Sequence, residues 1–209
     1  MFRIFILIFI HFSVSETGHA GIVEASAYMA KPAYVQTYKE IRRTFGTVPQ
    51  FLTRFPPETI SDVWNDYKRV WITNRGHLSR KNKLLLSISL SAQIPCKYCV
   101  YFFSSSAKAL EDVSTDQVNI ALAAANKKDL VAYLSAARAG CKVCLKLYSK
   151  AVLKQEISDK ELFEATSIIA EVEQWATYFA ETSPNEVHFK KEVDEFFSHQ
   201  KKLKIHRQR

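Results

Sequence analysis

The longest stretch without helix-breaking residues sets the fold class. Between Cys96 and Ser183 the chain contains no proline and a single glycine, Gly140. A strand must be followed by a turn every ~8–12 residues, and turns are rich in Gly and Pro, so helices are the elements that fill such a stretch. The whole chain of 209 residues has only 5 Gly and 6 Pro. The sequence therefore predicts an all-α fold.

Composition and charge narrow the class of protein. Hydrophobic residues make up 47% of the chain and charged residues 24%, which is typical of a globular protein and excludes a disordered or fibrous one. The 29 Lys and Arg exceed the 21 Asp and Glu, so the formal charge is +8. A basic tail over residues 201–209 carries part of this excess. It has no motif of a nucleic-acid-binding module, so we expect a solvated helix end and no nucleic acid as a partner.

Residues 1–20 have the pattern of a secretory signal peptide. Arg3 is followed by an apolar run over residues 4–12 and then by small residues. The run is far shorter than the ~18–20 residues of a membrane-spanning helix. We expect cleavage after Ser15 or Ala20 and export to the periplasm or secretion. The alternatives are an uncleaved membrane anchor and an incorrectly assigned start codon.

The rest of the chain divides into three parts. N-terminal helices occupy residues 21–75, a helical core with all four cysteines occupies 76–183, and a C-terminal helix with the basic tail occupies 184–209. Apolar spacing, prolines and glycines predict helices at 33–45, 49–52, 58–71, 78–91, from Pro95 onward, and at 185–204. The helix at 78–91 is small and apolar, and we expect it to be nearly fully buried.

The order of features within the core occurs twice. A Cys-x-x-Cys pair, an apolar helix, a serine cap and an alanine-rich run follow one another from Cys96 and again from Cys141. The pairs lie 45 positions apart, and the caps, Ser114 and Ser158, lie 44 apart. Each serine precedes Gln or Glu by three positions, the spacing of a capping box. We interpret this as an internal repeat of a helix–turn–helix unit; a chance similarity of alanine-rich helices is the alternative.

The four cysteines are the strongest chemical signal in the chain. They form two C-x-x-C pairs, Cys96/Cys99 and Cys141/Cys144, and this spacing on a helix puts both sulfurs on one face, close enough for a disulfide. At a helix N-terminus the free backbone N–H groups and the helix dipole lower the pKa of a thiol. A pair at a helix start is therefore a candidate redox site.

The local sequence favours the first pair over the second. Pro95 suits a helix start and Lys97 adds positive charge, so local physics makes Cys96 the activated thiol. The second pair follows Gly140 with no proline before it, and is the better candidate for a purely structural disulfide. One alternative is that both pairs form inert structural disulfides. A shared zinc ion is another, but 41 residues separate the pairs, against ~15–20 in zinc ribbons, so we expect no metal.

One segment of the core resembles a known protein family. The run from Leu78 to Phe103, with its Ala-Gln-Ile-Pro-Cys-Lys-Tyr-Cys-Val-Tyr-Phe string, resembles the carboxymuconolactone decarboxylase family, and more closely its branch related to alkylhydroperoxidase D. Residues 38–52 and 189–194 resemble the flanks of exported members. The resemblance implies an all-α homo-oligomer that reduces peroxides or disulfides at a C-x-x-C pair, with a thiol or dithiol as reductant. It implies no metal and no organic cofactor.

The resemblance also assigns roles to the cysteines. In this family the second cysteine attacks and the first resolves, which makes Cys99 the nucleophile and Cys96 the resolving thiol, opposite to the local argument. Active members relay the thiol's proton through a Glu twelve positions before the first Cys and a His four after the second. Here those positions hold Leu84 and Phe103, which cannot accept a proton.

We therefore predict a peroxiredoxin-like thiol oxidoreductase that is weakened by the loss of its proton relay. The alternative is a catalytically decayed member whose disulfides stabilise an assembly or binding protein. Tyr98 and Tyr101 lie near the cysteines, but an unperturbed Tyr is a poor base near pH 7. Glu171 and Glu173 lie beside Trp175 on a helix that we expect to pack near the site. We expect a solvated face for them; a buried Glu171 that replaces the missing base is the alternative.

Overall fold

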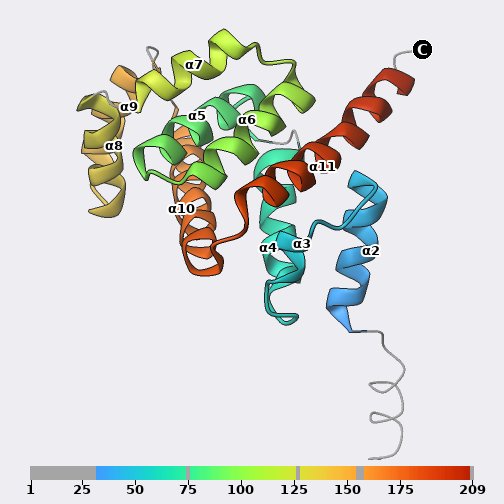
Figure 1. Cartoon of the computed structure of the whole chain (residues 1–209). Coiled ribbons are helices and arrows are strands. Elements are labelled where there is room, and N and C mark those ends of the chain that lie inside the picture. Colours follow the sequence, from blue (N-terminus) through green and yellow to red (C-terminus); the bar gives the residue numbers. More distant parts are fainter. Residues whose placement is uncertain (1–31, 74–75, 126–127, 154–157, 208–209) are drawn as a thin grey trace, which may run out of the picture. The chain divides into compact units, whose positions relative to one another are not determined.

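Helices are the only regular elements in the part of the chain that the structure describes, which confirms the predicted all-α class. The structure is a computed structural model that describes residues 32–73, 76–125, 128–153 and 158–207 (Figure 1). The predicted signal peptide over residues 1–20 lies outside the described residues. From Ala33 onward the helices pack as one unit. No described helix is long and apolar enough to cross a membrane.

Short connections join the helices. In chain order they are α2 (Ala33–Phe45), α3 (Gln50–Thr53), α4 (Ile60–Tyr67), the π-helical turn η1 (Lys68–Ile72), α5 (Arg80–Gln93), α6 (Lys97–Glu111), α7 (Thr115–Ala124), α8 (Lys128–Arg138), α9 (Lys142–Leu153), α10 (Asp159–Thr182) and α11 (Glu186–Arg207). The predicted bounds of α2 are correct. The single helix predicted over 58–71 is instead α4 continued by a wider π-turn.

Both predicted serine caps are present as capping boxes. The Ser114 hydroxyl accepts the N–H of Gln117 at the start of α7, and the Gln117 side chain accepts the N–H of Ser114 in return. Ser158 and Glu161 make the same pair of hydrogen bonds at the start of α10. These reciprocal bonds satisfy backbone N–H groups that a helix start otherwise leaves free, which is why the two helices begin where the sequence predicts.

Helix α5 is the central element of the fold. It packs against α6, α7, α10 and η1; Figure 1 shows it beside α6. The residues from Lys83 to Ser91 are buried apart from the partly exposed Leu85, whereas Arg80, Lys81 and Asn82 are not, so the predicted burial is confirmed only beyond the first turn. Its buried serines are satisfied locally: Ser87 and Ser91 donate to carbonyls four residues earlier, and Ser87 also accepts the indole N–H of Trp71 at 3.1 Å. Small side chains with internal hydrogen bonds let neighbouring helices approach α5 closely without unpaired polar groups.

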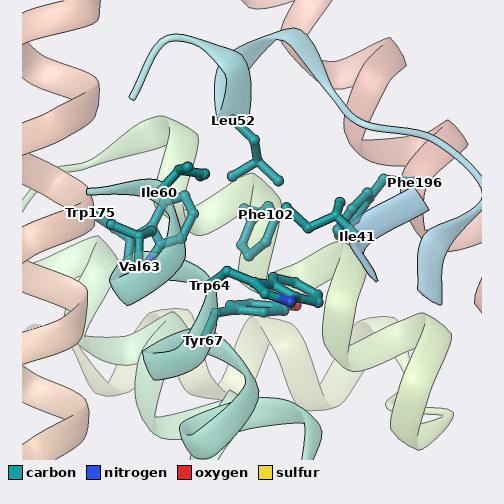
Figure 2. A pocket seen from close by; sticks show the side chains of 9 residues that line it. All are labelled: Ile41, Leu52, Ile60, Val63, Trp64, Tyr67, Phe102, Trp175 and Phe196. Carbon is teal, nitrogen blue, oxygen red and sulfur yellow. The ribbon is translucent and has the colours of Figure 1, made fainter. Parts of the chain in front are cut away.

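An aromatic cluster fills the space between α2, α4, α6, α10 and α11. Phe102 lies at its centre, with ring contacts to Tyr67, Trp175 and Phe197 at centroid distances of 5.3–5.8 Å. Figure 2 shows the cavity beside Phe102, which nine mostly apolar side chains line. Its volume is about 10 Å³, no more than one water molecule occupies. This cavity is a packing defect of the core rather than a ligand site.

A buried ion pair fixes the start of α5 to α10. Lys83 is 1% exposed, and its ammonium pairs with the carboxylate of Glu164. The same carboxylate accepts the backbone N–H groups of His77 and Leu78, each at 2.7 Å. Burial alone raises the pKa of Glu164, but these N–H groups and Lys83 hold it below its usual value. A Cβ on Gly76 would collide with this carboxylate, so the close approach requires glycine there.

The ion pair between Lys83 and Glu164 predicts how substitutions of either residue change the free energy of unfolding. Replacing Glu164 by Leu leaves the Lys83 charge buried without a partner, and we expect a loss of about 3–5 kcal/mol in the free energy of unfolding. Adding Lys83→Met removes that charge and is expected to recover most of the loss. Urea unfolding followed by circular dichroism measures both variants. A double variant no more stable than Glu164→Leu alone would contradict the ion-pair argument.

Candidate functional site

The first cysteine pair lies at the start of α6. Cys96 is the N-cap residue, and the backbone N–H of Cys99 donates to the Cys96 sulfur at 3.2 Å. The two sulfurs form a disulfide, with their Cα atoms 5.3 Å apart. The sequence prediction that Pro95 starts this helix is wrong by two residues, because Cys96 itself caps α6 and the helix begins at Lys97.

The two sulfurs of this pair have different surroundings. Cys99 is 0% exposed and belongs to the hydrophobic core, whereas Cys96 is partly exposed and lines a surface groove. A thiolate from solution therefore reaches Cys96 and not Cys99. After reduction, a Cys96 thiolate would retain the N–H of Cys99 and the positive end of the α6 dipole, both of which lower the pKa of a thiol.

The groove beside Cys96 has a volume of about 860 Å³ and is formed by three segments. Its lining consists of Ile94, Pro95, Cys96, Lys97 and Tyr98 at the start of α6, Arg138 at the end of α8, and Glu173, Ala176, Thr177, Phe179, Ala180 and Ser183 along the C-terminal half of α10. The sequence predicts that the helix with Glu171 and Glu173 packs near the site, but not which of its residues line the groove. Positions 173, 176, 177 and 180 lie on one helix face. The spacing alone does not predict that this face lies beside the cysteine pair.

The cationic side chains of the groove are paired with carboxylates. Arg138 donates from two guanidinium nitrogens to one oxygen of Glu173, at 2.8 and 2.6 Å. Lys97 pairs with Glu186 at 2.6 Å, and hydrogen bonds from Lys190 and Lys97 lower the pKa of Glu186 to about 2. The positive charge that the sequence placed beside Cys96 is therefore largely compensated in the folded protein.

The two tyrosines near the cysteines are engaged elsewhere. The hydroxyl of Tyr98 donates to the carbonyl of Pro184 at 2.6 Å, which ties the first turn of α6 to the start of α11. The hydroxyl of Tyr101 donates to the Asp194 carboxylate at 2.9 Å. Partial burial and that carboxylate raise the pKa of Tyr101 above its ordinary value. Both side chains act as structural donors, so neither takes the place of a base.

The two positions at which the family resemblance implies a proton relay lie inside the core. Leu84 on α5 is 0% exposed and Phe103 on α6 is 1% exposed. Phe103 packs against Trp71 at a centroid distance of 5.0 Å. Phe103 follows Cys99 by one helical turn and shares its face, as a relay residue requires, but its ring supplies packing and no proton acceptor.

The prediction that Glu171 lies on a solvated face is wrong. Its side chain is buried between α10 and η1, where it pairs with Arg69 at 3.4 Å. Burial, and then the neighbouring Asp66 carboxylate, raise the pKa of Glu171 to about 7. It does not line the groove of Cys96. Glu173 is partly exposed, lines the groove and pairs with Arg138, so no freely available carboxylate base comes from either residue.

The second cysteine pair has the same local geometry at the start of α9. Cys141 and Cys144 form a disulfide with Cα atoms 5.3 Å apart, and the Cys144 N–H donates to the Cys141 sulfur at 3.3 Å. Both residues are partly exposed, and neither lines the groove of the first pair. Asp159 at the start of α10 pairs with Lys146 at 2.5 Å. Within the described residues, no three His, Cys, Asp or Glu side chains are arranged to hold a metal ion.

The buried carboxyl of Glu171 predicts a pH dependence of stability. Its pKa is raised from 4.5 to about 7, so the folded protein binds more protons than the unfolded chain in that window, and stability falls as pH rises through it. Glu171→Gln should remove up to about 3 kcal/mol of this fall. Unfolding free energies at pH 5 and pH 8 test it, with Glu173→Gln as the control. An unchanged difference between these pH values in Glu171→Gln would refute it.

Comparison with known proteins adds no family assignment. No protein-family model, no curated protein sequence and no solved structure matches this chain. The predicted relation to the carboxymuconolactone decarboxylase family stays a prediction from the sequence of residues 78–103. What the chain does has to be argued from the two cysteine pairs and the groove.

Proposed function

We propose that the protein is a thiol–disulfide oxidoreductase that acts through Cys96 and Cys99. One observation carries the proposal: the disulfide lies at a helix N-terminus with one sulfur in a surface groove and the other completely buried. Exchange needs one reachable sulfur whose thiolate is stabilised and a second, protected sulfur close enough to close the disulfide again. This pair meets both requirements.

The reaction begins from the reduced protein. The Cys96 thiolate attacks one sulfur of a substrate disulfide, forms a mixed disulfide and releases the other substrate sulfur as a thiolate. Cys99 then attacks the Cys96 sulfur, which re-forms the Cys96–Cys99 disulfide and expels the second substrate sulfur; this sulfur takes up the proton of the Cys99 thiol and leaves as a thiol. The substrate has gained two electrons. A dithiol reductant restores the reduced pair and is itself oxidised to a disulfide.

This proposal reverses the roles that the family resemblance implies for the cysteines. Attack by Cys99 needs an exposed sulfur and a base, but the sulfur is buried and the relay positions hold Leu84 and Phe103. Loss of general-base catalysis lowers a rate by about 10²–10⁴. We therefore propose disulfide substrates for the main activity, and peroxide reduction only as a weak one.

The alkylhydroperoxidase-D-like fold with its internal repeat belongs to the same proposal. The order of α5, α6 and α7 is repeated by α8, α9 and α10, and each middle helix begins with a C-x-x-C disulfide whose first sulfur accepts the N–H of the second cysteine. The capping boxes of α7 and α10 recur in the corresponding places. These features support a duplicated unit.

We also propose a homo-oligomer and export. Large apolar side chains stay exposed on four helices, which supports an assembly: Ile120, Val143, Leu147, Phe163 and Val187. Two disulfides support an oxidising compartment outside the cytoplasm.

A second candidate function is an assembly or binding protein with purely structural disulfides. The observation in its favour is that Leu84 and Phe103 are fully integrated into the core, as expected if selection for a proton relay has ended. The two functions differ in one measurable property, the reducibility of the Cys96–Cys99 disulfide by a dithiol.

The main test follows exchange at each sulfur of the reduced protein. With 5,5′-dithiobis(2-nitrobenzoate), we expect Cys99→Ser to react rapidly at Cys96 and to stay as a mixed disulfide, because the resolving thiol is gone. Cys96→Ser should react more than about tenfold more slowly, since Cys99 is buried. Both variants are made in a Cys141→Ser/Cys144→Ser background, because the partly exposed thiols of the second pair would also react. The background protein with Cys96 and Cys99 intact should close its disulfide and release both halves of the reagent.

Two results would overturn the proposal. Faster reaction at Cys99 than at Cys96 would restore the order of roles found in the family. A first pair that a dithiol leaves oxidised in the folded protein would identify the disulfide as structural.

The relay positions give a separate prediction. Leu84→Glu together with Phe103→His should raise the rate of peroxide-dependent oxidation of Cys99 by about tenfold or more. Either change alone should do little, because a lone Glu at position 84 is desolvated and stays neutral. The four proteins are compared by alkylation and mass measurement after timed peroxide exposure. A wild type that is already as fast as the double variant would show that another base serves Cys99.

A further inference from the structure

We infer that the groove beside Cys96 binds an extended segment of another polypeptide, with a large apolar side chain next to the disulfide-bonded cysteine of that segment. This inference rests on the proposed exchange at Cys96. It names the substrate class: a cysteine disulfide within a polypeptide, rather than a small charged disulfide or a peroxide.

The size of the groove supports a polypeptide. Its volume of about 860 Å³ lies near the upper end of the ~300–1,000 Å³ found for small-molecule sites, and it lies open along α10 instead of closing around a ligand. The four α10 positions 173, 176, 177 and 180 form a strip beside Cys96. Consecutive turns of one helix give the groove a direction, which suits an extended chain.

The lining is apolar where a side chain would enter. Ile94 and Tyr98 are partly exposed and contribute apolar surface next to the cysteine pair, above the buried ring of Phe179. Ala176 and Ala180 face the groove with only a methyl group each, and this leaves room along α10. An apolar side chain that enters this space removes its own apolar surface and that of the groove from water. This burial is the main source of affinity between polypeptides.

The polar groups of the groove suit a peptide backbone rather than an anion. Arg138 is paired one to one with Glu173, and Lys97 shares Glu186 with Lys190, so the cations of the groove already hold carboxylates that an anionic disulfide such as oxidised glutathione would have to displace. The hydroxyls of Thr177 and Ser183 donate to carbonyls within α10 and keep lone pairs that can accept a backbone N–H. Such hydroxyl oxygens accept hydrogen bonds from the N–H groups of neutral amides, as in a peptide backbone.

The test uses a protein in which Cys96 is the sole cysteine, with Cys99, Cys141 and Cys144 replaced by Ser. Two probes carry the same 2-thiopyridyl leaving group on a cysteine: a neutral eight-residue peptide with Leu beside its Cys, and N-acetylcysteine amide. Release of the leaving group measures the exchange rate. We expect the peptide to react about tenfold faster or more, since burial of one large apolar side chain changes a binding constant by that factor.

Groove-filling variants locate the preference. Ala180→Trp should remove the advantage of the peptide, which is read as the ratio of the peptide rate to the small-probe rate in the same variant; Thr177→Trp repeats the test at a second position of the strip. Ala123→Trp, at an exposed alanine on α7, is the matched control and should keep the advantage. Equal rates for both probes in the unfilled protein would overturn this inference alone. No reaction of Cys96 with either probe would overturn the proposed exchange, and this inference with it.

Discussion

The burial of α5 is the constraint on which the rest of the structure depends. Because α5 contacts α6, α7, α10 and η1, its buried side chains have to be small or apolar. Its buried serines are tolerated because their hydroxyls donate to carbonyls of the preceding turn. Its one buried charge, Lys83, is compensated by Glu164 of α10. Because that carboxylate also holds the backbone before α5, a single buried group fixes both the position of α5 and the register of α10 against it.

The arrangement on which the proposed thiol–disulfide exchange depends follows from where α5 ends and α6 begins. α6 packs along α5 with Phe102 and Phe103 in the core, so the first turn of α6 has one side facing inward and one facing the groove. Cys99 lies on the inward side and Cys96 caps the helix at the surface. The difference between the two sulfurs is thus a property of the helix packing. The C-x-x-C spacing alone would treat them nearly alike.

The two disulfides illustrate how similar local chemistry acquires different surroundings. Both first cysteines accept the N–H of the second, and both pairs begin a helix. Only the first of them lines the groove formed with α8 and α10, and the buried Cys99 has no equivalent in the partly exposed Cys144. We therefore assign exchange to the first pair.

The sequence by itself determined the helical class, the capping boxes at Ser114 and Ser158 and the pairing of cysteines three positions apart, because these depend on spacing within a few residues. The small and apolar composition of residues 78–91 also predicted that most of α5 is buried. Only the tertiary structure decided that Glu171 is buried against Arg69, that Arg138 and Glu173 meet across the groove, and that Cys96 is the reachable sulfur. The two ion pairs are contacts between residues of different helices, and the exposure of Cys96 depends on which side of α6 its neighbours cover. Local spacing in the sequence does not predict which side of a helix another helix covers.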